Sequence, residues 1–305
     1  MRQIARSRVV GAALAVALVA AACGSGGDTG DIEGPTVTVA SFNFNESTIL
    51  AEIYAQVLEN DGYPVARRLN LGNREVVKPA LESGEISLVP EYVGTLLGFL
   101  GGSPSADPEA TWQAAKDLWE PEGVTLLAFA PGEDKNAYVV TRATAEALGL
   151  SRVSDLQPVA GELVFGGPPE CPDRDLCLKG LEEVYGLQFA EFKPLDVGGP
   201  LTVAALKGGD IDVALLFSSQ GIILVEDFVV LDDDQDLNPA ENIVPAVARE
   251  VVDAYGDEFV SLLDSVSALI TTEVLIELNR RADIDQVDPA VVAKDWLVGQ
   301  GLIGG

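Results

Sequence analysis

The chain has 305 residues, 48% of them hydrophobic, with 48 acidic and 19 basic side chains, no histidine and a formal net charge of −29. The hydrophobic content argues against a disordered chain. The negative field argues against nucleic acid or anionic lipid as a partner, but it would not repel a cationic or zwitterionic ligand. Such a length suits two lobes better than one.

The N-terminal residues predict export. Arg2, Arg6 and Arg8 precede an apolar run at 9–22, which is shorter than the roughly 20 residues of a membrane-spanning helix. Residues 1–22 are therefore predicted to be a signal peptide. The residues just before Cys23 (AAAC, 20–23) resemble a bacterial lipobox, in which Cys23 would be lipidated; a plain signal peptide and an uncleaved anchor are the alternatives. Residues 23–35, rich in Gly, Ser and Asp, are typical of a flexible tether.

The first half of the mature chain alternates strands with helices. Strands are expected at 36–41, 65–71 and 86–89, where β-branched and apolar residues gather. Helices are expected at 47–60, 73–84 and 93–100, the second of them shortened or kinked by Pro79. Strands that alternate with helices predict an α/β sheet.

The second half repeats this rhythm. Strands are expected at 137–142, 163–165, 212–217 and 229–231, and helices at 143–149, 178–185 and 201–207. From Val247 onward the pattern is helical, at 249–255, 258–267, 272–283 and 289–300. We predict lobe 1 from residues 36–133 plus 237–305 and lobe 2 from residues 134–236. The chain would cross between the lobes twice, which suits hinge closure around a ligand.

Cysteine usage agrees with export. If Cys23 is lipidated, only Cys171 and Cys177 remain, six positions apart in a loop rich in Pro and Asp. We predict a local disulfide between them, which in the chain-entropy description contributes roughly 2–2.5 kcal/mol. A metal-binding pair is the alternative, although the chain offers no histidine and no second cysteine pair.

Five segments carry a family resemblance: SFNFNE (41–46), AEIYAQ (51–56), LGNREVV (71–77), PALESGEI (79–86) and PEYVGT (90–95). They resemble the osmoprotectant-binding family of ABC transporters, which binds glycine betaine, choline, carnitine and related quaternary ammonium compounds. Residues 79–95 are the most specific part, and shorter matches continue to residue 234. The resemblance implies a two-lobed periplasmic-binding-protein fold (type II-like) with two chain crossovers and a ligand in the cleft between lobes.

The resemblance also implies site residues. Tyr92 falls on the aromatic of the family's Pro-Glu-Tyr motif, and Thr95 on its carboxylate-binding hydroxyl. Asn136 and Tyr138 resemble the Asn/aromatic pair that opens lobe 2, and Phe217 resembles a later aromatic of the cleft. Aromatic faces suit a methylated ammonium, because it cannot donate strong hydrogen bonds but is attracted to the ring by cation–π interaction.

Three further positions bear on the cargo. Phe42 stands where family members often carry Lys or another polar residue, and Val203 stands where a cage aromatic is expected in lobe 2. Both departures leave open a bulkier or less carboxylate-dependent ligand than betaine. Arg174 resembles a carboxylate-binding arginine of some members, but it lies between the two cysteines.

Residues 41–45 lie between a predicted strand and a helix N-terminus, where exposed backbone N–H groups suit a carboxylate. Phe42, Asn43 and Asn45 are therefore candidate ligand contacts. The alternative is that Asn45 or Ser47 only caps the helix. If the segment stays extended, side chains alternate and only one of its faces meets the cleft.

Two other patterns are interpreted as structural. Trp112 and Trp119, seven residues apart on a predicted helix, are expected to pack in the core or on the lobe surface. Residues 232–236 contain the alternating aspartates of a calcium loop, but Leu237 and Ile243 stand where Gly and the closing Glu belong. We expect a solvated acidic turn there and no metal.

Enzymatic function is not indicated, because histidine is absent and no Gly-rich phosphate loop appears. We expect a monomeric binding protein without cofactor on the outer face of the cell membrane, held there by a lipid on Cys23. Its expected partners are a small-molecule ligand and the permease subunits of an ABC importer. A different small solute as cargo, or a role as a ligand-sensing lipoprotein, is the alternative.

Overall fold

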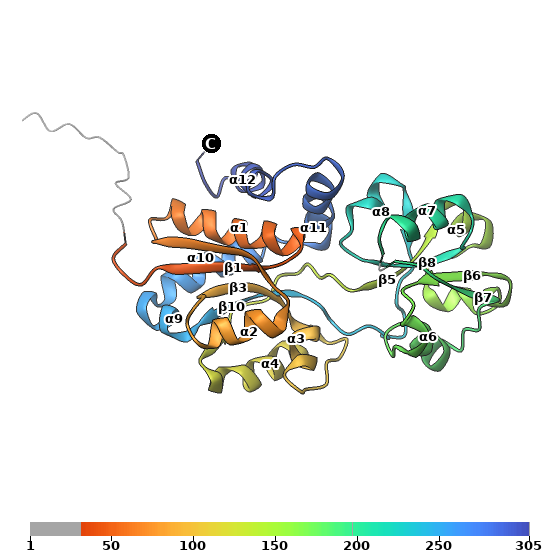
Figure 1. Ribbon diagram of the computed structural model, residues 1–305, viewed down its shortest axis with the longest axis horizontal. Helices are drawn as coiled ribbons and strands as arrows, with labels where there is room; N and C mark the ends of the chain where they lie inside the picture. The colour runs from red at the N-terminus through yellow and green to blue at the C-terminus, as the bar shows by residue number, and fades with distance from the viewer. Residues whose placement is uncertain (1–31, 197, 305) are drawn as a thin grey trace, which may run out of the picture. The chain divides into compact units, whose positions relative to one another are not determined.

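The structure, a computed structural model, describes residues 32–196 and 198–304. The predicted signal peptide, Cys23 and most of the predicted tether lie outside the described residues. Two five-stranded sheets organise the chain (Figure 1), with strand orders β2-β1-β3-β10-β4 and β7-β6-β8-β5-β9. The predicted α/β class with two lobes is confirmed.

The sheet of lobe 1 is built from β1 (Val37–Phe42), β2 (Val65–Gly72), β3 (Leu88–Tyr92), β4 (Val124–Leu126) and β10 (Ile243–Ala248). β1 runs parallel to β2 and β3, whereas β10 is antiparallel to both β3 and β4. Every residue of β3 and β10 is buried, because helices cover both faces of the sheet. Strands covered on both faces do not alternate apolar and polar residues; the one charged residue of β3 and β10 is Glu91.

Helices on the two faces bury the sheet of lobe 1. In Figure 1, α1 and α12 lie on one side of the sheet, and α2, α3 and α4 lie on the other. The lobe 1 helices are α1 (Asn45–Asn60), α2 (Arg74–Glu82), α3 (Val93–Phe99), α4 (Pro108–Trp119), α9 (Arg249–Tyr255), α10 (Asp257–Ser267), α11 (Thr272–Asn279) and α12 (Pro289–Gln300). A π-helical turn, Arg280–Ile284, continues α11.

The sheet of lobe 2 contains β5 (Asn136–Thr141), β6 (Val164–Gly167), β7 (Glu191–Pro194), β8 (Val213–Phe217) and β9 (Phe228–Val230). Its helices are α5 (Arg142–Leu148), α6 (Leu178–Tyr185), α7 (Pro200–Gly208) and α8 (Gly221–Val225). The sheet separates two apolar clusters: Tyr138 and Val140 belong to one, Ala137 and Val139 to the other. This division follows from the two-residue period of a strand.

Two connections join the lobes, residues 127–135 and residues 231–242. The predicted lobe boundaries, 133/134 and 236/237, fall within these connections. Glu133 pairs with Asn242 in an isolated antiparallel bridge, and the backbone N–H of Asp134 donates to the Glu241 carbonyl at 3.1 Å. The two connections therefore run side by side where the chain passes between lobes.

Three strands were not predicted: β4, β7 and β10. β10 has the sequence IVPAVA, and proline within a run argues against a central strand because it lacks an N–H. The structure places Pro245 opposite Pro90 of β3. The predicted helix at 272–283 ends earlier, at Asn279, where the π-helical turn begins.

Within the described ranges, no single helix is long and apolar enough to cross a membrane. α10 and the helix that follows it meet the length and composition criteria only together, with a bend of 77° between them. Phe259, Leu263 and Val266 of α10 are buried in the core of lobe 1, as expected for a core helix.

Candidate ligand-binding site

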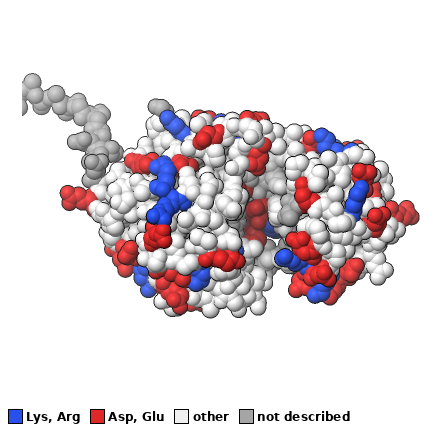
Figure 2. Space-filling model, in the orientation of Figure 1, with Lys and Arg blue, Asp and Glu red and all other residues white. Residues whose placement is uncertain are grey.

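A cavity of about 380 Å³ lies at the carboxyl ends of β1, β3 and β8, beside the first residue of β5 and both connections. Ligands of open α/β sheets bind at such strand ends. Figure 2 shows more acidic than basic side chains on the visible face, some of them in the hollow between the lobes. The lining residues are Phe42, Asn43, Phe44, Asn73, Arg74, Tyr92, Thr95, Asp134, Lys135, Asn136, Leu176, Phe217, Asn238, Pro239 and Glu241.

Four aromatic rings line this cavity. Phe42 and Phe44 stack with ring centroids 6.0 Å apart and planes 2° from parallel. Tyr92 lies 6.0 Å from Phe44 and is tilted by 38°. Phe217, at the end of β8, supplies the fourth ring from lobe 2. Such faces attract a cation by their quadrupole, each by about 0.5–2 kcal/mol.

The turn between β1 and α1 holds two of these rings in place. The Ser47 hydroxyl accepts the backbone N–H of Phe42 at 2.9 Å, so Ser47 fixes the turn instead of capping the helix. The Ser41 hydroxyl accepts the N–H of Asn70 in β2 at 2.8 Å. The helix N-cap is Phe44, whose side chain makes no capping bond.

A buried ion pair lies under one wall. The Arg74 guanidinium donates to both oxygens of Glu91, from Nε at 3.1 and 3.2 Å and from Nη2 at 2.8 Å. It also donates to the Thr95 hydroxyl at 3.0 Å and stands 5.5 Å from the Phe42 ring centroid. Glu91 is 0% exposed, so its carboxylate has no water to interact with and depends on Arg74 as its counter-ion.

Glu241 lies on the other side of Thr95. The Thr95 hydroxyl is 3.4 Å from Glu241 Oε2, and Gly94 packs so closely that a side chain there would meet this carboxylate and the Ala240 carbonyl. Burial raises the pKa of Glu241 to about 7, although the Arg74 charge opposes that shift. This carboxyl therefore titrates near neutrality.

A second group of carboxylates surrounds Tyr92. The Tyr92 hydroxyl donates to Glu46 Oε1 at 2.7 Å, and Asn279 Nδ2 donates to Glu46 Oε2 and, at 2.9 Å, to the Ser219 carbonyl. Burial raises the pKa of Glu46. Burial and then the Glu46 charge raise the pKa of Asp134 to about 8. Asn279 thus links a carboxylate of lobe 1 to the backbone of lobe 2.

An adjoining cavity of about 660 Å³ shares part of this wall. Asn43, Phe44, Asp134 and Phe217 line both cavities. The other residues of the adjoining cavity are Asn45, Glu46, Ser219, Gln220, Asn279 and Asp283.

Six of the eight predicted contacts line the first cavity: Phe42, Asn43, Tyr92, Thr95, Asn136 and Phe217. Asn45 does not. It begins α1, its side-chain amide donates to Asp283 at 2.7 Å, and it faces only the adjoining cavity. The helix start turns Asn45 away from the side on which Phe42 and Tyr92 lie.

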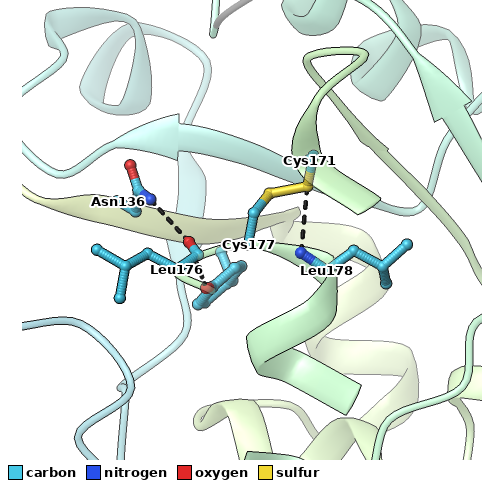
Figure 3. Close-up of a disulfide and its surroundings, with 6 residues drawn as sticks. Asn136, Cys171, Leu176, Cys177 and Leu178 are labelled. Carbon is cyan, nitrogen blue, oxygen red and sulfur yellow. Dashed lines mark hydrogen bonds between the residues drawn. A yellow bond between two sulfur atoms is a disulfide. The ribbon is translucent and has the colours of Figure 1, made fainter. Parts of the chain in front are cut away.

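Tyr138 also lies outside the cavity lining, as a correction to the predicted aromatic pocket. It is buried in the core of lobe 2, where its hydroxyl contacts the loop between the cysteines; Figure 3 shows that loop, with Asn136 pointing to Leu176. The Leu176 carbonyl accepts Asn136 Nδ2 at 2.8 Å and the Tyr138 hydroxyl at 3.3 Å. The structure joins Cys171 and Cys177 in a disulfide, and Leu176 between them lines the cavity in place of Tyr138.

The remaining expectations also have definite places. Val203 lies on α7 and lines a separate cavity with Gly199 and Ile284; it does not line the cavity that contains Tyr92 and Phe217. Arg174 lines another cavity, beside the disulfide, which shares Asn136, Leu176 and Phe217 with the first. Trp119 is buried and Trp112 half-buried in the core of lobe 1, as predicted.

The acidic turn has a structural role. Asp233 accepts hydrogen bonds from the backbone of Leu237 and Asn238 at 3.0 and 2.7 Å, and from the Tyr185 hydroxyl. No group of three or more His, Cys, Asp or Glu side chains within residues 32–196 and 198–304 is arranged to hold a metal ion.

Sequence reasoning missed Arg74, Asp134, Asn238 and Glu241. Arg74 stood inside a segment quoted for the resemblance, but a lone arginine after a strand carries no role by itself. Asp134, Asn238 and Glu241 lie in the connections between lobes. The predicted lobe boundaries could have pointed to these three residues, because a cleft between two lobes is also lined by the segments that connect the lobes.

Comparison with known proteins places the chain in a family. Residues 35–298 match the model of the substrate-binding domain of ABC-type glycine betaine transport systems. The chain is 30% identical over 277 residues to a glycine-betaine-binding protein of Pseudomonas aeruginosa, covering 87% of this chain and 88% of the relative. It is 29% identical over 280 residues to the carnitine transport binding protein OpuCC of Listeria monocytogenes, covering 90% and 88%.

A solved structure agrees with this assignment. The crystal structure of a glycine betaine/carnitine/choline ABC transporter protein superposes with a TM-score of 0.82 at 26% identity, covering 88% of this chain and 99% of that one. The chain therefore belongs to the family of substrate-binding domains of ABC-type glycine betaine transport systems.

Proposed function

We propose that this chain is the extracytoplasmic substrate-binding lipoprotein of an ABC importer, capturing a quaternary ammonium or zwitterionic osmoprotectant and delivering it to the permease. The observation that carries the proposal is the cavity with rings from both lobes, Phe42, Phe44, Tyr92 and Phe217, beside buried carboxylates. Three or four such rings with satisfied polar groups suffice for micromolar affinity, about −8 kcal/mol.

The relatives' substrates support this class of cargo. Proteins similar to this chain are named for binding glycine betaine and carnitine. The cavity of about 380 Å³ falls within the usual size range of small-molecule sites. Family membership makes transport the expected role and provides no support for an enzymatic one.

Export and anchoring rest on the N-terminal sequence. The basic residues, the apolar run and the AAAC motif ending at Cys23 have the order expected of a lipoprotein signal. Globomycin treatment of cells that express the full chain should accumulate the uncleaved precursor. Normal processing in the presence of this inhibitor would contradict lipidation of Cys23.

The cargo is tested by calorimetry. The chain from Cys23 onward, with Cys23→Ser, should be titrated with glycine betaine, choline, carnitine, ectoine and proline. We expect at least one quaternary amine to bind, and Tyr92→Ala to weaken it about 2- to 30-fold, the equivalent of one cation–π contact. Trp112→Ala removes a ring outside the cavity and should leave affinity unchanged. If no quaternary amine binds, the proposal fails.

The neighbouring genes distinguish a role in transport from a role in sensing. Genes for a permease and an ATPase beside this gene favour transport, whereas a neighbouring signalling receptor favours a sensor. Deletion of the gene should abolish uptake of the cargo at low external concentration if the chain serves an importer.

A further inference from the structure

We propose that the cavity selects a ligand of net positive charge, a quaternary ammonium that carries no carboxylate. The inference rests on the proposed function and narrows its substrate class. It follows from the balance of charges around the cavity: the basic groups are already paired, and several buried carboxylates are not.

Two basic residues line the cavity, Arg74 and Lys135. Arg74 is engaged by both oxygens of the fully buried Glu91. Lys135 Nζ lies 2.8 Å from Glu133 Oε1. A ligand carboxylate would have to compete with a protein carboxylate at either position. The Arg74–Glu91 contact is bidentate and the Glu91 carboxylate is fully buried. If Arg74 turned to a ligand carboxylate, Glu91 would be left as a buried charge without its counter-ion, which is costly.

By contrast, none of the ion pairs among the described residues involves Glu46, which lines only the adjoining cavity, or Asp134, which lines both cavities. Glu46 is held by the Tyr92 hydroxyl and the Asn279 amide. Asp134 accepts the N–H of Ser219 at 3.3 Å. These donors are uncharged, so each carboxylate is solvated by the protein but not neutralised by it.

Glu241 does have a positive charge nearby, that of Arg74, but the Thr95 hydroxyl lies between the two side chains and hydrogen-bonds to both. Arg74 therefore contacts Glu91 directly and interacts with Glu241 only at longer range. The adjoining cavity strengthens the imbalance: Glu46, Asp134 and Asp283 line it, and no lysine or arginine does. The first cavity alone has as many acidic as basic lining residues, but the two cavities together are lined by four acidic residues, Glu46, Asp134, Glu241 and Asp283, and by two basic ones, Arg74 and Lys135.

This arrangement discriminates between two ligands that share a trimethylammonium group. The aromatic faces attract that group in both. The difference in affinity comes from the second functional group of the ligand. A ligand hydroxyl can donate a hydrogen bond to a protein carboxylate. A ligand carboxylate is repelled by the protein carboxylates, and this repulsion is strong in a site of low dielectric. The cation also compensates protein carboxylates, so binding should favour their ionised form.

Ionisation of these groups gives an independent signal. Asp134 faces Glu46 and Glu241, with Tyr92 beside them, and Glu241 faces Arg74 and Glu91. Since the pKa of Asp134 is raised to about 8 and that of Glu241 to about 7, both groups are partly protonated at neutral pH. Binding of a cation should release protons, whereas binding of a zwitterion should release fewer.

The test compares choline with glycine betaine on the chain from Cys23 onward with Cys23→Ser. We expect choline to bind at least tenfold more tightly at pH 8. Glu241→Gln and Asp134→Asn should each weaken choline about tenfold while leaving betaine unchanged or improved. Asp227→Asn, which changes an exposed carboxylate of lobe 2, should change neither affinity. Titrations at pH 7 in phosphate and in Tris should show proton release with choline.

Two outcomes overturn the inference in distinguishable ways. If betaine binds as tightly as choline, and both variants weaken the two ligands equally, the site selects the ammonium but not the net charge, and only this inference falls. If neither ligand binds and no other quaternary amine does, the proposed function falls as well. If the enthalpy of choline binding is the same in phosphate and in Tris, no protons are released on binding, and this would also contradict the role given to the carboxylates.

Discussion

The Tyr92 hydroxyl donates a 2.7 Å hydrogen bond to Oε1 of the buried Glu46 carboxylate. The ring that faces the cavity and the charge behind it are therefore one unit. This contact also joins the end of β3 to the first turn of α1, two segments that lie 46 residues apart in sequence.

Replacing Tyr92 by Phe separates the two halves of this unit. The variant keeps the ring but removes one of the donors to Glu46, so the free energy of unfolding should fall by about 1–3 kcal/mol. Affinity for a quaternary amine should change less than it does in Tyr92→Ala, which also loses the ring. Urea unfolding and calorimetry of the two variants test this. Equal loss of affinity in both would show that the hydroxyl, not the ring, contacts the ligand.

The Arg74–Glu91 pair makes a second prediction. Arg74→Met leaves an uncompensated charge at a fully buried carboxylate and should lower the free energy of unfolding by about 3–5 kcal/mol. The double variant Arg74→Met/Glu91→Gln should recover much of this loss. The matched control is the exposed pair of Arg142 and Asp227, 51% and 67% exposed, where Arg142→Met should have far less effect. A single Arg74 variant as stable as this control would contradict the prediction.

Stability of the ligand-free protein should depend on pH. Asp134 and Glu241 have folded-state pKa values of about 8 and about 7, above their ordinary values, so the folded state binds more protons than the unfolded one in this range. Stability should therefore be greatest near pH 4–5 and fall as pH rises to 8, by at most about 1.4 kcal/mol per pH unit for each group. Thermal unfolding of wild type and Asp134→Asn from pH 5 to 8 measures this.

In the Asp134→Asn variant the slope between pH 7 and 8 should flatten, because the group that titrates there is gone. A wild-type melting temperature that stays constant from pH 5 to 8 would contradict the assignment. So would an unchanged slope in the variant.

The disulfide should affect both stability and binding. In the chain-entropy description, the double variant Cys171→Ala/Cys177→Ala should lose about 2–2.5 kcal/mol of stability. It should also bind ligand more weakly, because the loop sets the Leu176 carbonyl against Asn136 and Tyr138. Calorimetry on this variant, with a double alanine substitution at the exposed Lys179 and Asp175 as control, tests it. Unchanged affinity would show that the loop holds its position without the crosslink.

Gly221 tests the packing of α8 against the π-helical turn. A Cβ at Gly221 would lie 2.4 Å from backbone atoms of Arg280, so Gly221→Ala should cost about 1–3 kcal/mol and displace α8. Gly299 lies in α12 with open space around it. There the same substitution should be neutral or stabilising by up to about 1 kcal/mol. Equal effects of the two substitutions in thermal unfolding would contradict the contact.

Local patterns predicted most of the regular elements. The helices at 178–185, 249–255 and 289–300 have the predicted bounds, because glycine stops, proline starts and apolar spacing mark them in the sequence. β10 was missed for the reverse reason: an apolar run containing Pro245 is central only because β3 and β4 accept it from far along the chain. No local signal carries that pairing.

The candidate site shows the same division. Residues at strand ends, such as Tyr92, Asn136 and Phe217, were predicted from motif and position. Tyr138 was misplaced because strand periodicity gives the side on which a ring lies but not what contacts it, and here the Leu176 loop does. The Arg74–Glu91 pair could not be predicted, because with 48 acidic residues in the chain any arginine has many candidate partners in sequence.

The position of β10 sets the order in which the protein can be completed. β4 pairs only with β10 among the described strands, and β10 stands between β3 and β4. Residues 243–248 follow the whole of lobe 2, so a nascent chain that ends before them has an unfilled gap in its first sheet. The sheet of lobe 1 can therefore be completed only after the chain has been synthesised through residue 248, with lobe 2 already made.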